Sequence, residues 1–228
     1  MSDFYRHLLS RDGLENEGLT PYPQLDQVSA AMVVDAEDAR FLDEGLGGIY
    51  MANRIAALDD PTTTFTVFDW TIWEEGPGVK SIYPANPTVG KAGGMVLRAD
   101  SVAELAGKIG ADPETLTKTV DAYNAAVRSG NRTGATPPRT DGAEPATPLD
   151  APPFMAITLA VGITATMGGL LVDANMQVRD ANDQPMPGLY AAGGTTGGLE
   201  GGGALGYVGG LIKATTKGLI AAEATSRT

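Results

Sequence analysis

The feature that most constrains this chain is the density of glycine near its C-terminus. Between Gly193 and Gly210, ten of eighteen positions are glycine. Glycine loses more backbone entropy on folding than any other residue, so such a cluster needs a physical reason. One reason is the close approach of backbone N–H groups to a ligand. The cluster therefore predicts a segment that binds a ligand through its main chain.

The elements expected on either side of the glycine segment support this interpretation. A short buried strand is predicted at Leu189 to Ala192, and a helix is predicted to begin near Gly209 and to continue through 211–222. The positive end of that helix would face whatever lies in the segment. A flexible surface loop is the alternative, but linkers seldom interleave apolar residues as this segment does with Leu199, Leu205, Tyr207 and Val208.

Three of these glycines also match the pattern GxGxxG, namely Gly201, Gly203 and Gly206. The nucleotide-binding fingerprint follows a strand directly and opens a βαβ unit. Here eight residues separate the predicted strand from Gly201, and a single helix follows. The match is therefore not interpreted as that fingerprint.

Composition excludes several kinds of chemistry. The chain has 228 residues, a formal net charge of -12, no cysteine, and His7 as its only histidine. The acidic balance disfavours nucleic acid as a partner. Without thiols, and with one histidine that we interpret as structural, neither a metal site nor a Ser-His-Asp triad is expected. The chemistry is expected to belong to a cofactor.

No stretch approaches the roughly 20 apolar residues of a membrane span. The N-terminal residues MSDFYRHLLSRDG lack the apolar core and cleavage site of a signal peptide. A cytoplasmic protein is expected.

Upstream of the glycine segment, the apolar pattern predicts strands at Val28 to Val34, Thr63 to Phe68 and Ile157 to Val161. A long loop is expected over 74–94, and the proline-rich stretch 134–153 is expected to mark a boundary. A hairpin is predicted from 169–172 and 176–178.

Two helices have clear start signals. Ser101 and Glu104 form the pattern of a capping box, in which each side chain would accept from the other's backbone N–H. That helix would end at Gly110. Asp112 is predicted to cap the next helix, with Pro113 at its first position.

Several motifs together resemble one enzyme family. TMGG at 166–169 and PGLYAAG at 187–193 precede the glycine-led helix, and FYRHLLSRDGLEN, DARFLDEG and ELAGKIGADPETLTKTVDAYNAAV occur upstream. Their order is similar to the C-terminal portion of the FAD-dependent fumarate reductase, succinate dehydrogenase flavoprotein and 3-ketosteroid dehydrogenase family.

The resemblance implies an α+β cap domain joined to the C-terminal part of an α/β, Rossmann-like FAD-binding domain. Residues 1–34 would be an initial segment from the FAD domain, 35–150 the substrate-covering cap, and 151–228 the C-terminal FAD-binding segment. The N-terminal GxGxxG unit of the family is expected to be absent from this chain. A companion chain carrying that half is the implied partner.

The resemblance also assigns site residues. The family places the region around Gly193 beside the ribityl chain of FAD and the first turn of the last helix against the isoalloxazine ring. The residues so implied to bind FAD are Gly193, Gly194, Thr195, Gly206, Gly209, Gly210 and Leu211. Tyr207 would lie near flavin and substrate and handle a proton, although simple packing is an equal alternative. Tyr83 is a second aromatic candidate from the cap.

Departures from the family pattern bear on the substrate. Fumarate reductases carry histidines just before TMGG, where this chain has Thr164 and Ala165, and no Arg or Lys lies between Arg179 and Lys213. A dicarboxylate would lack a cationic clamp. We therefore expect an FAD-dependent oxidoreductase that exchanges hydride between flavin N5 and a CH–CH or C=C bond next to a ketone. The small apolar ketone would be steroid-like. The alternative is a non-catalytic remnant or a regulatory or scaffold subunit of such a flavoenzyme.

Overall fold

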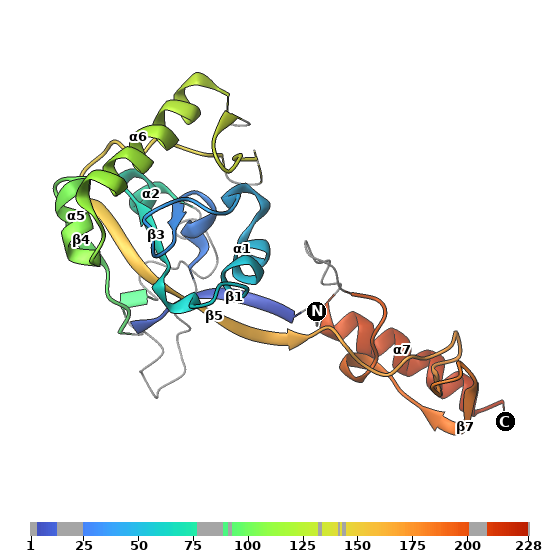
Figure 1. Ribbon diagram of the computed structural model, residues 1–228. Coiled ribbons are helices and arrows are strands. Elements are labelled where there is room, and N and C mark those ends of the chain that lie inside the picture. The colour runs from blue at the N-terminus through green and yellow to red at the C-terminus, as the bar shows by residue number, and fades with distance from the viewer. Residues whose placement is uncertain are drawn as a thin grey trace. The chain divides into compact units, whose positions relative to one another are not determined.

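The computed structural model describes residues 4–12, 25–76, 89–90, 93–131, 134–140, 142, 145–200 and 209–227. The chain divides into two compact units. The larger unit comprises Arg6–Gly162, and the C-terminal unit comprises Met1–Tyr5 with Ile163–Thr228. Figure 1 shows the elements of both units, and each unit is described by itself below.

The larger unit is built on a five-stranded sheet. Its strand order is β1 (Phe4–Ser10), β5 (Phe154–Thr166), β3 (Phe65–Phe68) and β2 (Met32–Val34), and β4 (Leu97–Ala99) also pairs with β5. The β2–β3, β3–β5 and β4–β5 ladders are antiparallel. Ala156 of β5 lies opposite Val67 on one side and Leu97 on the other, so this part of β5 is central in the sheet.

The predicted strands are present but differ in extent. Only Met32–Val34 of the predicted 28–34 strand enters the sheet, because Asp26–Ser29 forms a 3-10 turn, η2. All three residues of β2 are fully buried. An apolar run buried on both sides carries no period that would distinguish a strand from a turn, which explains the misplaced boundary.

The helices whose full bounds lie among the described residues of the larger unit are α1 (Gly48–Ile55), α2 (Trp70–Glu75), α5 (Val102–Ile109) and α6 (Pro113–Ser129), with short turns η3 (Glu44–Leu46) and η4 (Pro61–Thr63). α5 packs against α6 (Figure 1). α2 begins at Trp70, before the predicted 74–94 loop, and its last two residues, Glu74 and Glu75, extend into that range.

The predicted helix caps are confirmed in large part. The Ser101 side chain accepts from Glu104 N, and the Asp112 side chain accepts from Thr115 N. The capping box was wrong in one partner, because the Glu104 carboxylate accepts from Asp100 N at 3.1 Å and not from Ser101 N. Its backbone partner is therefore one residue farther from the helix.

A buried carboxylate joins distant parts of the larger unit. The Glu44 side chain is fully buried and receives two hydrogen bonds from Arg40, Nε to Oε1 at 3.0 Å and Nη2 to Oε2 at 2.6 Å. Val33 N donates to the same carboxylate at 3.1 Å, and Arg139 Nε lies 3.8 Å from Oε2. In turn, Arg139 Nη2 donates to Ser29 O at 2.6 Å. One carboxylate thus ties η2, β2, the 40–44 turn and the 137–140 segment together.

Two further buried polar side chains fix the return of the chain to β5. Asp69 caps α2 by accepting from Ile72 N and also accepts from Asp150 N and Ala151 N. Asn124 of α6 exchanges hydrogen bonds with the backbone of Leu149. The segment Leu149 to Ala151, which leads into β5, is therefore held by hydrogen bonds between its backbone and the side chains of Asp69 at the start of α2 and Asn124 of α6.

The C-terminal unit contains a small antiparallel pair, β6 (Gln177–Arg179) and β7 (Pro185–Tyr190), the turn η6 (Gly193–Thr195) and the helix α7 (Gly210–Thr225). The predicted buried strand at 189–192 is confirmed only at Leu189 and Tyr190, where β7 ends, and its burial is wrong because the first five residues of β7 are exposed. The predicted 169–172 and 176–178 hairpin is present as an antiparallel bridge between Val172 and Val178, flanked by the hydrogen bonds Arg179 N to Leu171 O and Asp173 N to Gln177 O. β6 also pairs with β7.

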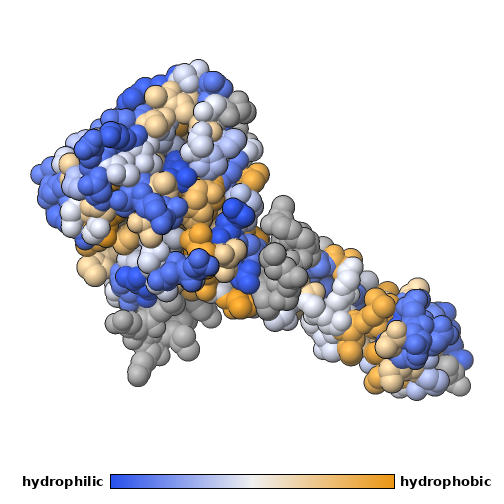
Figure 2. Space-filling model, in the orientation of Figure 1, coloured by the Kyte–Doolittle hydropathy of each residue, from blue (hydrophilic) through white to orange (hydrophobic). Residues whose placement is uncertain are grey.

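The C-terminal unit has very little apolar interior. Among its described residues only three hydrophobic side chains are buried: Met167, Met176 and Val178. Nine large hydrophobic side chains of this unit are exposed: Ile163, Leu170, Leu171, Met186, Leu189, Leu199, Leu211, Ile212 and Leu219. Figure 2 shows hydrophobic atoms on the surface of this part of the chain.

No helix formed by the described residues has the length and apolar character needed to cross a membrane.

Replacing Glu44 should destabilise the larger unit strongly. Glu44→Gln keeps the shape of the side chain but removes the buried negative charge that faces Arg40 and Arg139. We expect a loss of about 3–5 kcal/mol in the free energy of unfolding. The measurement is urea denaturation followed by the fluorescence of Trp70 and Trp73, the two tryptophans of the chain.

Glu114→Gln is the matched control, because it breaks the exposed i,i+4 pair with Lys118. It should cost less than about 1 kcal/mol. Equal stability losses in the two variants would contradict the role given to Glu44.

Candidate functional site

The glycine segment meets the first turns of α7. Gly193 begins η6 with φ of +69°, and a Cβ at this position would lie 3.3 Å from the Cβ of Ala214 in α7. α7 starts at Gly210, with Gly209 as its N-cap at φ of +94°. Both backbone conformations are strained for residues with a side chain. Glycine is therefore needed at the start of the turn and at the start of the helix.

The TMGG motif packs backbone to backbone against the glycine segment. Leu170 N donates to Thr195 O at 2.8 Å, and Gly197 N donates to Leu170 O at 3.1 Å. A Cβ on Gly169 would lie 2.5 Å from Gly197 N, and a Cβ on Gly197 would lie 2.9 Å from Gly169 N. Some of the glycine density thus serves internal packing, which the ligand interpretation of the sequence did not foresee.

Two lysines of α7 hold the glycine segment. Lys213 Nζ forms an ion pair of 2.6 Å with Glu200, and both side chains are buried, at 7% and 4% exposure. One turn farther along, Lys217 Nζ donates to Thr196 Oγ1 at 2.7 Å. The Thr196 hydroxyl donates to Gly193 O at 2.8 Å. Sequence reasoning missed these contacts, because lysine in an apolar helix is normally expected to face solvent.

The structure brings together most of the predicted cofactor-binding residues. Gly193, Gly194 and Thr195 form η6, which packs on α7. Gly209, Gly210 and Leu211 form the start of α7, where Leu211 is 88% exposed. The remaining predicted site residues, Gly206, Tyr207 and Tyr83, lie outside the residues that the structure describes.

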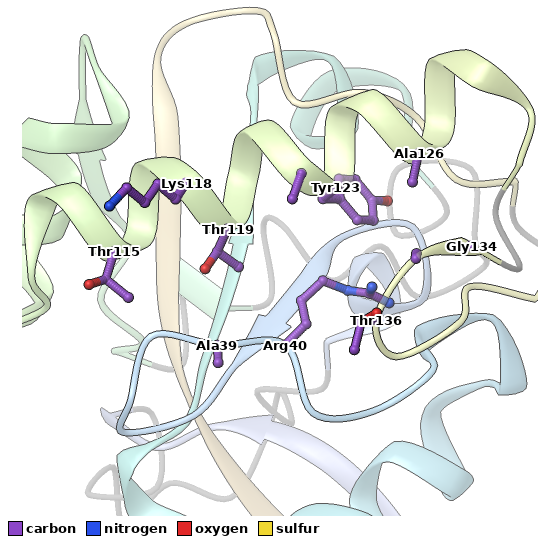
Figure 3. Close-up of a pocket in the computed structure, with 11 residues that line it drawn as sticks. Ala39, Arg40, Thr115, Lys118, Thr119, Tyr123, Ala126, Gly134 and Thr136 are labelled. Atoms are coloured by element: carbon purple, nitrogen blue, oxygen red, sulfur yellow. The ribbon is translucent and has the colours of Figure 1, made fainter.

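The described residues of the larger unit form a pocket of about 520 Å³ between α6 and the segments 39–40 and 134–136. Figure 3 shows Arg40, Tyr123 and Thr136 on its walls. Arg40 is neutralised by Glu44, and Lys118 pairs with Glu114. Burial, and then the nearby Glu44 carboxylate, raise the pKa of Tyr123, so its phenol is neutral at ordinary pH.

Two threonine hydroxyls of that pocket are also engaged. The Thr115 hydroxyl donates to Asp112, and the Thr119 hydroxyl donates to Asp38 O. The pocket therefore presents mainly methyl groups, and none of the residues predicted from the sequence to carry chemistry lines it.

No group of three or more His, Asp or Glu side chains in the described part of the chain could hold a metal ion.

Comparison with known proteins now identifies the family. The model of the FAD binding domain family matches residues 5–207. The chain belongs to this FAD-binding family. FAD is accordingly its cofactor, and the resemblance drawn from TMGG, PGLYAAG and the glycine segment is confirmed at the level of the family.

Two curated members of related function illustrate the similarity. A fumarate reductase (cytochrome) of Shewanella frigidimarina is 31% identical over 178 residues, which cover 78% of this chain and 29% of the relative. A 4-oxocyclohex-2-ene-1-carboxylate 5-dehydrogenase of Sinomonas cyclohexanicum is 28% identical over 218 residues, covering 86% of this chain and 36% of the relative. The chain thus spans about a third of the length of these relatives.

Solved structures of flavoenzymes share the fold. The 3-ketosteroid Δ1-dehydrogenase of Sterolibacterium denitrificans has a TM-score of 0.68 at 21% identity, with coverage of 98% of this chain and 43% of that chain. The open conformation of a flavocytochrome c3 fumarate reductase has a TM-score of 0.61 at 23% identity, with coverage of 99% and 36%. The FAD-binding chain therefore has a mixed α and β flavoenzyme fold.

The contact of η6 with α7 can be tested by one pair of glycine substitutions. Gly193→Ala should loosen the segment, because alanine is strained at φ of +69° by about 1–2 kcal/mol and meets Ala214. Gly194→Ala should be tolerated, because no atom lies within 4 Å of its Cβ position. The measurement is amide hydrogen exchange in α7, which should speed up only in the Gly193 variant. Equal exchange in both variants would contradict the packing described here.

Proposed function

We propose that this chain forms part of an FAD-dependent oxidoreductase acting on a CH–CH or C=C bond next to a ketone. The observation that carries the proposal is the glycine-led start of α7, with η6 packed against it, in a chain of the FAD-binding family. When bound, the flavin supplies hydride exchange at N5. The curated relatives are named as oxidoreductases of this general kind.

The residues present fit the flavin end of FAD. Gly193, Gly194 and Thr195 would hold it from η6, and Gly209, Gly210 and Leu211 from the first turn of α7. Gly194 has no heavy atom within 4 Å of its Cβ position, so open space lies beside the turn. The N-terminus of α7 carries partial positive charge, which suits the negative charge of a reduced flavin.

The cations of this region support an uncharged substrate. Lys213 is paired with Glu200, and Lys217 donates to Thr196. The described residues of the glycine segment and α7 contain no other basic side chain, and Arg227, which follows α7, pairs with Glu223. Because a dicarboxylate binds best to paired cations, we favour a small apolar ketone, steroid-like in character. Tyr207 and Tyr83 remain the proposed proton-handling residues.

The exposed apolar surface of the C-terminal unit supports a companion that carries the nucleotide-binding half of the FAD domain. Three buried apolar side chains cannot compensate the conformational entropy of some 60 ordered residues. Nine exposed large apolar side chains form the kind of surface that monomers rarely leave uncovered. The relatives are about three times as long as this chain, and we assign the cover of this surface to such additional sequence.

We further propose that residues 35–150 act as a cap over the substrate, with 1–34 as an initial segment from the FAD domain and 151–228 as the flavin segment. The larger contact unit extends beyond the proposed cap at both ends, because β2 and β5 are paired with β3. A cap of this kind would exclude water from the reacting atoms. The cytoplasmic location expected from the sequence stays a prediction.

Flavin binding can be tested through Gly209. The protein, alone or with the companion half, should show flavin absorbance bands after purification in the presence of FAD. Gly209→Val should abolish them, because a β-branched residue is strained at φ of +94° where the flavin would approach the backbone. Gly218→Val is the matched control, since Gly218 in α7 has open space and no positive φ. Full flavin occupancy in the Gly209 variant would contradict the placement.

The companion surface can be tested through Leu219, which is 60% exposed. Leu219→Gln should leave the fold intact and weaken association with the nucleotide-binding half about tenfold, because it removes apolar contact area. Leu46→Gln in the larger unit is the control, since Leu46 is exposed to a similar degree. The measurement is analytical ultracentrifugation of the mixed chains. An unchanged dissociation constant for the Leu219 variant would show that Leu219 of α7 does not contribute to the interface.

A second function, a non-catalytic subunit or remnant, is favoured by one observation: the lysines nearest the glycine segment are already engaged with protein groups. The flavin-loaded protein should distinguish the two. An oxidoreductase would reduce an artificial electron acceptor with a cyclic 3-ketone such as a 3-ketosteroid, and succinate would serve as the matched charged control. Flavin that no such ketone reduces would favour the subunit role.

A further inference from the structure

The buried pair of Lys213 and Glu200 has no place in the function proposed so far. Glu200 is the last residue described before the glycine segment continues, and Lys213 lies in the first turn of α7. Their charged atoms are 2.6 Å apart, and both side chains are almost fully withdrawn from solvent. The pair therefore links the glycine segment at Glu200 to the first turn of α7 at Lys213.

The pair is unfavourable for stability alone. A lysine in the first turn of a helix opposes the partial positive charge of that end. Desolvation of two charges offsets much of their attraction, so an apolar pair of similar size would serve a core as well or better. A buried ion pair at such a place points to a role in geometry or charge.

The neighbouring contacts show that the pair belongs to a larger clamp. Lys217 lies one turn after Lys213, and its partner Thr196 lies four residues before Glu200. Two lysines on one side of α7 thus hold two points of the glycine segment. Since Thr196 also donates to Gly193 O, the clamp reaches the turn η6.

We propose that Lys213 and Glu200 are a positioning pair that fixes the glycine segment at the start of α7 and keeps the charge there neutral. The inference rests on the proposed function, because the residues it positions are those assigned to the flavin. With the pair intact, the opposite charges of Lys213 and Glu200 offset each other at this helix end. Removing either partner both frees the segment and leaves a single charge beside the flavin-binding turn.

The charge role predicts opposite shifts in the two single variants. Glu200→Gln leaves the Lys213 ammonium uncompensated, which favours the reduced, negatively charged flavin and raises its reduction potential. Lys213→Met removes the positive charge 2.6 Å from the Glu200 carboxylate, which makes this helix end more negative and lowers the potential. A pair with only a packing role would shift the potential of both variants in the same direction or not at all.

The positioning role predicts that both single variants lose FAD affinity. Both single variants should bind FAD at least about tenfold more weakly than the parent protein, because a buried charge loses its partner. Amides of 193–200 and 209–213 should exchange faster in both. The exchanged pair, Lys213→Glu with Glu200→Lys, should recover part of the slow exchange and of the FAD affinity.

The experiment uses the full chain with its companion half, loaded with FAD, and compares these variants with Glu223→Gln. That control breaks the exposed pair with Arg227 at the far end of α7. Reduction potentials are measured by dye equilibration, and hydrogen exchange is measured on the same proteins without FAD. If a single variant fails to fold, the exchanged pair and the other single variant still decide the outcome.

Opposite potential shifts with faster exchange of both segments would support the inference. Exchange and potentials no different from those of Glu223→Gln would overturn it. If the parent protein binds no FAD, the proposed function and the charge role of the pair are both wrong. The hydrogen exchange measurement still decides whether the pair positions the glycine segment.

Discussion

The larger unit depends on a single buried acid. Glu44 lies with no solvent exposure among Arg40, Arg139 and the backbone of Val33, and the segments that meet there are separated by about a hundred residues of sequence. Withdrawing one carboxylate and two guanidinium groups from water is costly unless every partner is present. The site is therefore stable only when η2, β2 and the 137–140 segment are all in place. We expect the Glu44 contacts to form only once these three parts of the larger unit have folded together.

The two units are stabilised by different kinds of contact. The larger unit has a continuous apolar core that includes strands, α1, α5 and α6, with polar side chains such as Asp69 and Asn124 at its edges. The C-terminal unit relies on backbone contacts between glycines, on a two-stranded pair and on the lysines of α7. Its apolar residues are largely on the outside, where a larger FAD domain would cover them. The part of the chain proposed to hold the cofactor is thus the part least able to fold by itself.

Local signals in the sequence predicted local structure well. Ser101 and Asp112 cap helices as expected, because a cap depends on residues only three positions apart. The exposure of β7 was not predictable, because apolar residues such as Met186 and Leu189 in a short strand normally indicate an interior position. The Glu44 and Lys213 ion pairs were missed, since sequence alone does not show that residues 139 and 44, or 213 and 200, meet.

The candidate site was predicted to a similar extent. The glycine segment and the start of α7 were assigned from their composition and from the family resemblance, and the structure brings η6 and α7 together. The sequence did not show which glycines leave room for a ligand and which leave room for another segment of main chain. Both kinds are simply glycine in the sequence. Gly169 and Gly197 belong to the second kind.

That glycine pair has an evolutionary consequence. Where two side chains collide, a second substitution that shortens one of them can restore the fit. Between Gly169 and Gly197 the obstacle to any added carbon is main chain on the opposite segment, which no substitution can shorten. No second substitution can therefore relieve this collision. We expect that variants which keep the fold of the glycine segment keep both glycines.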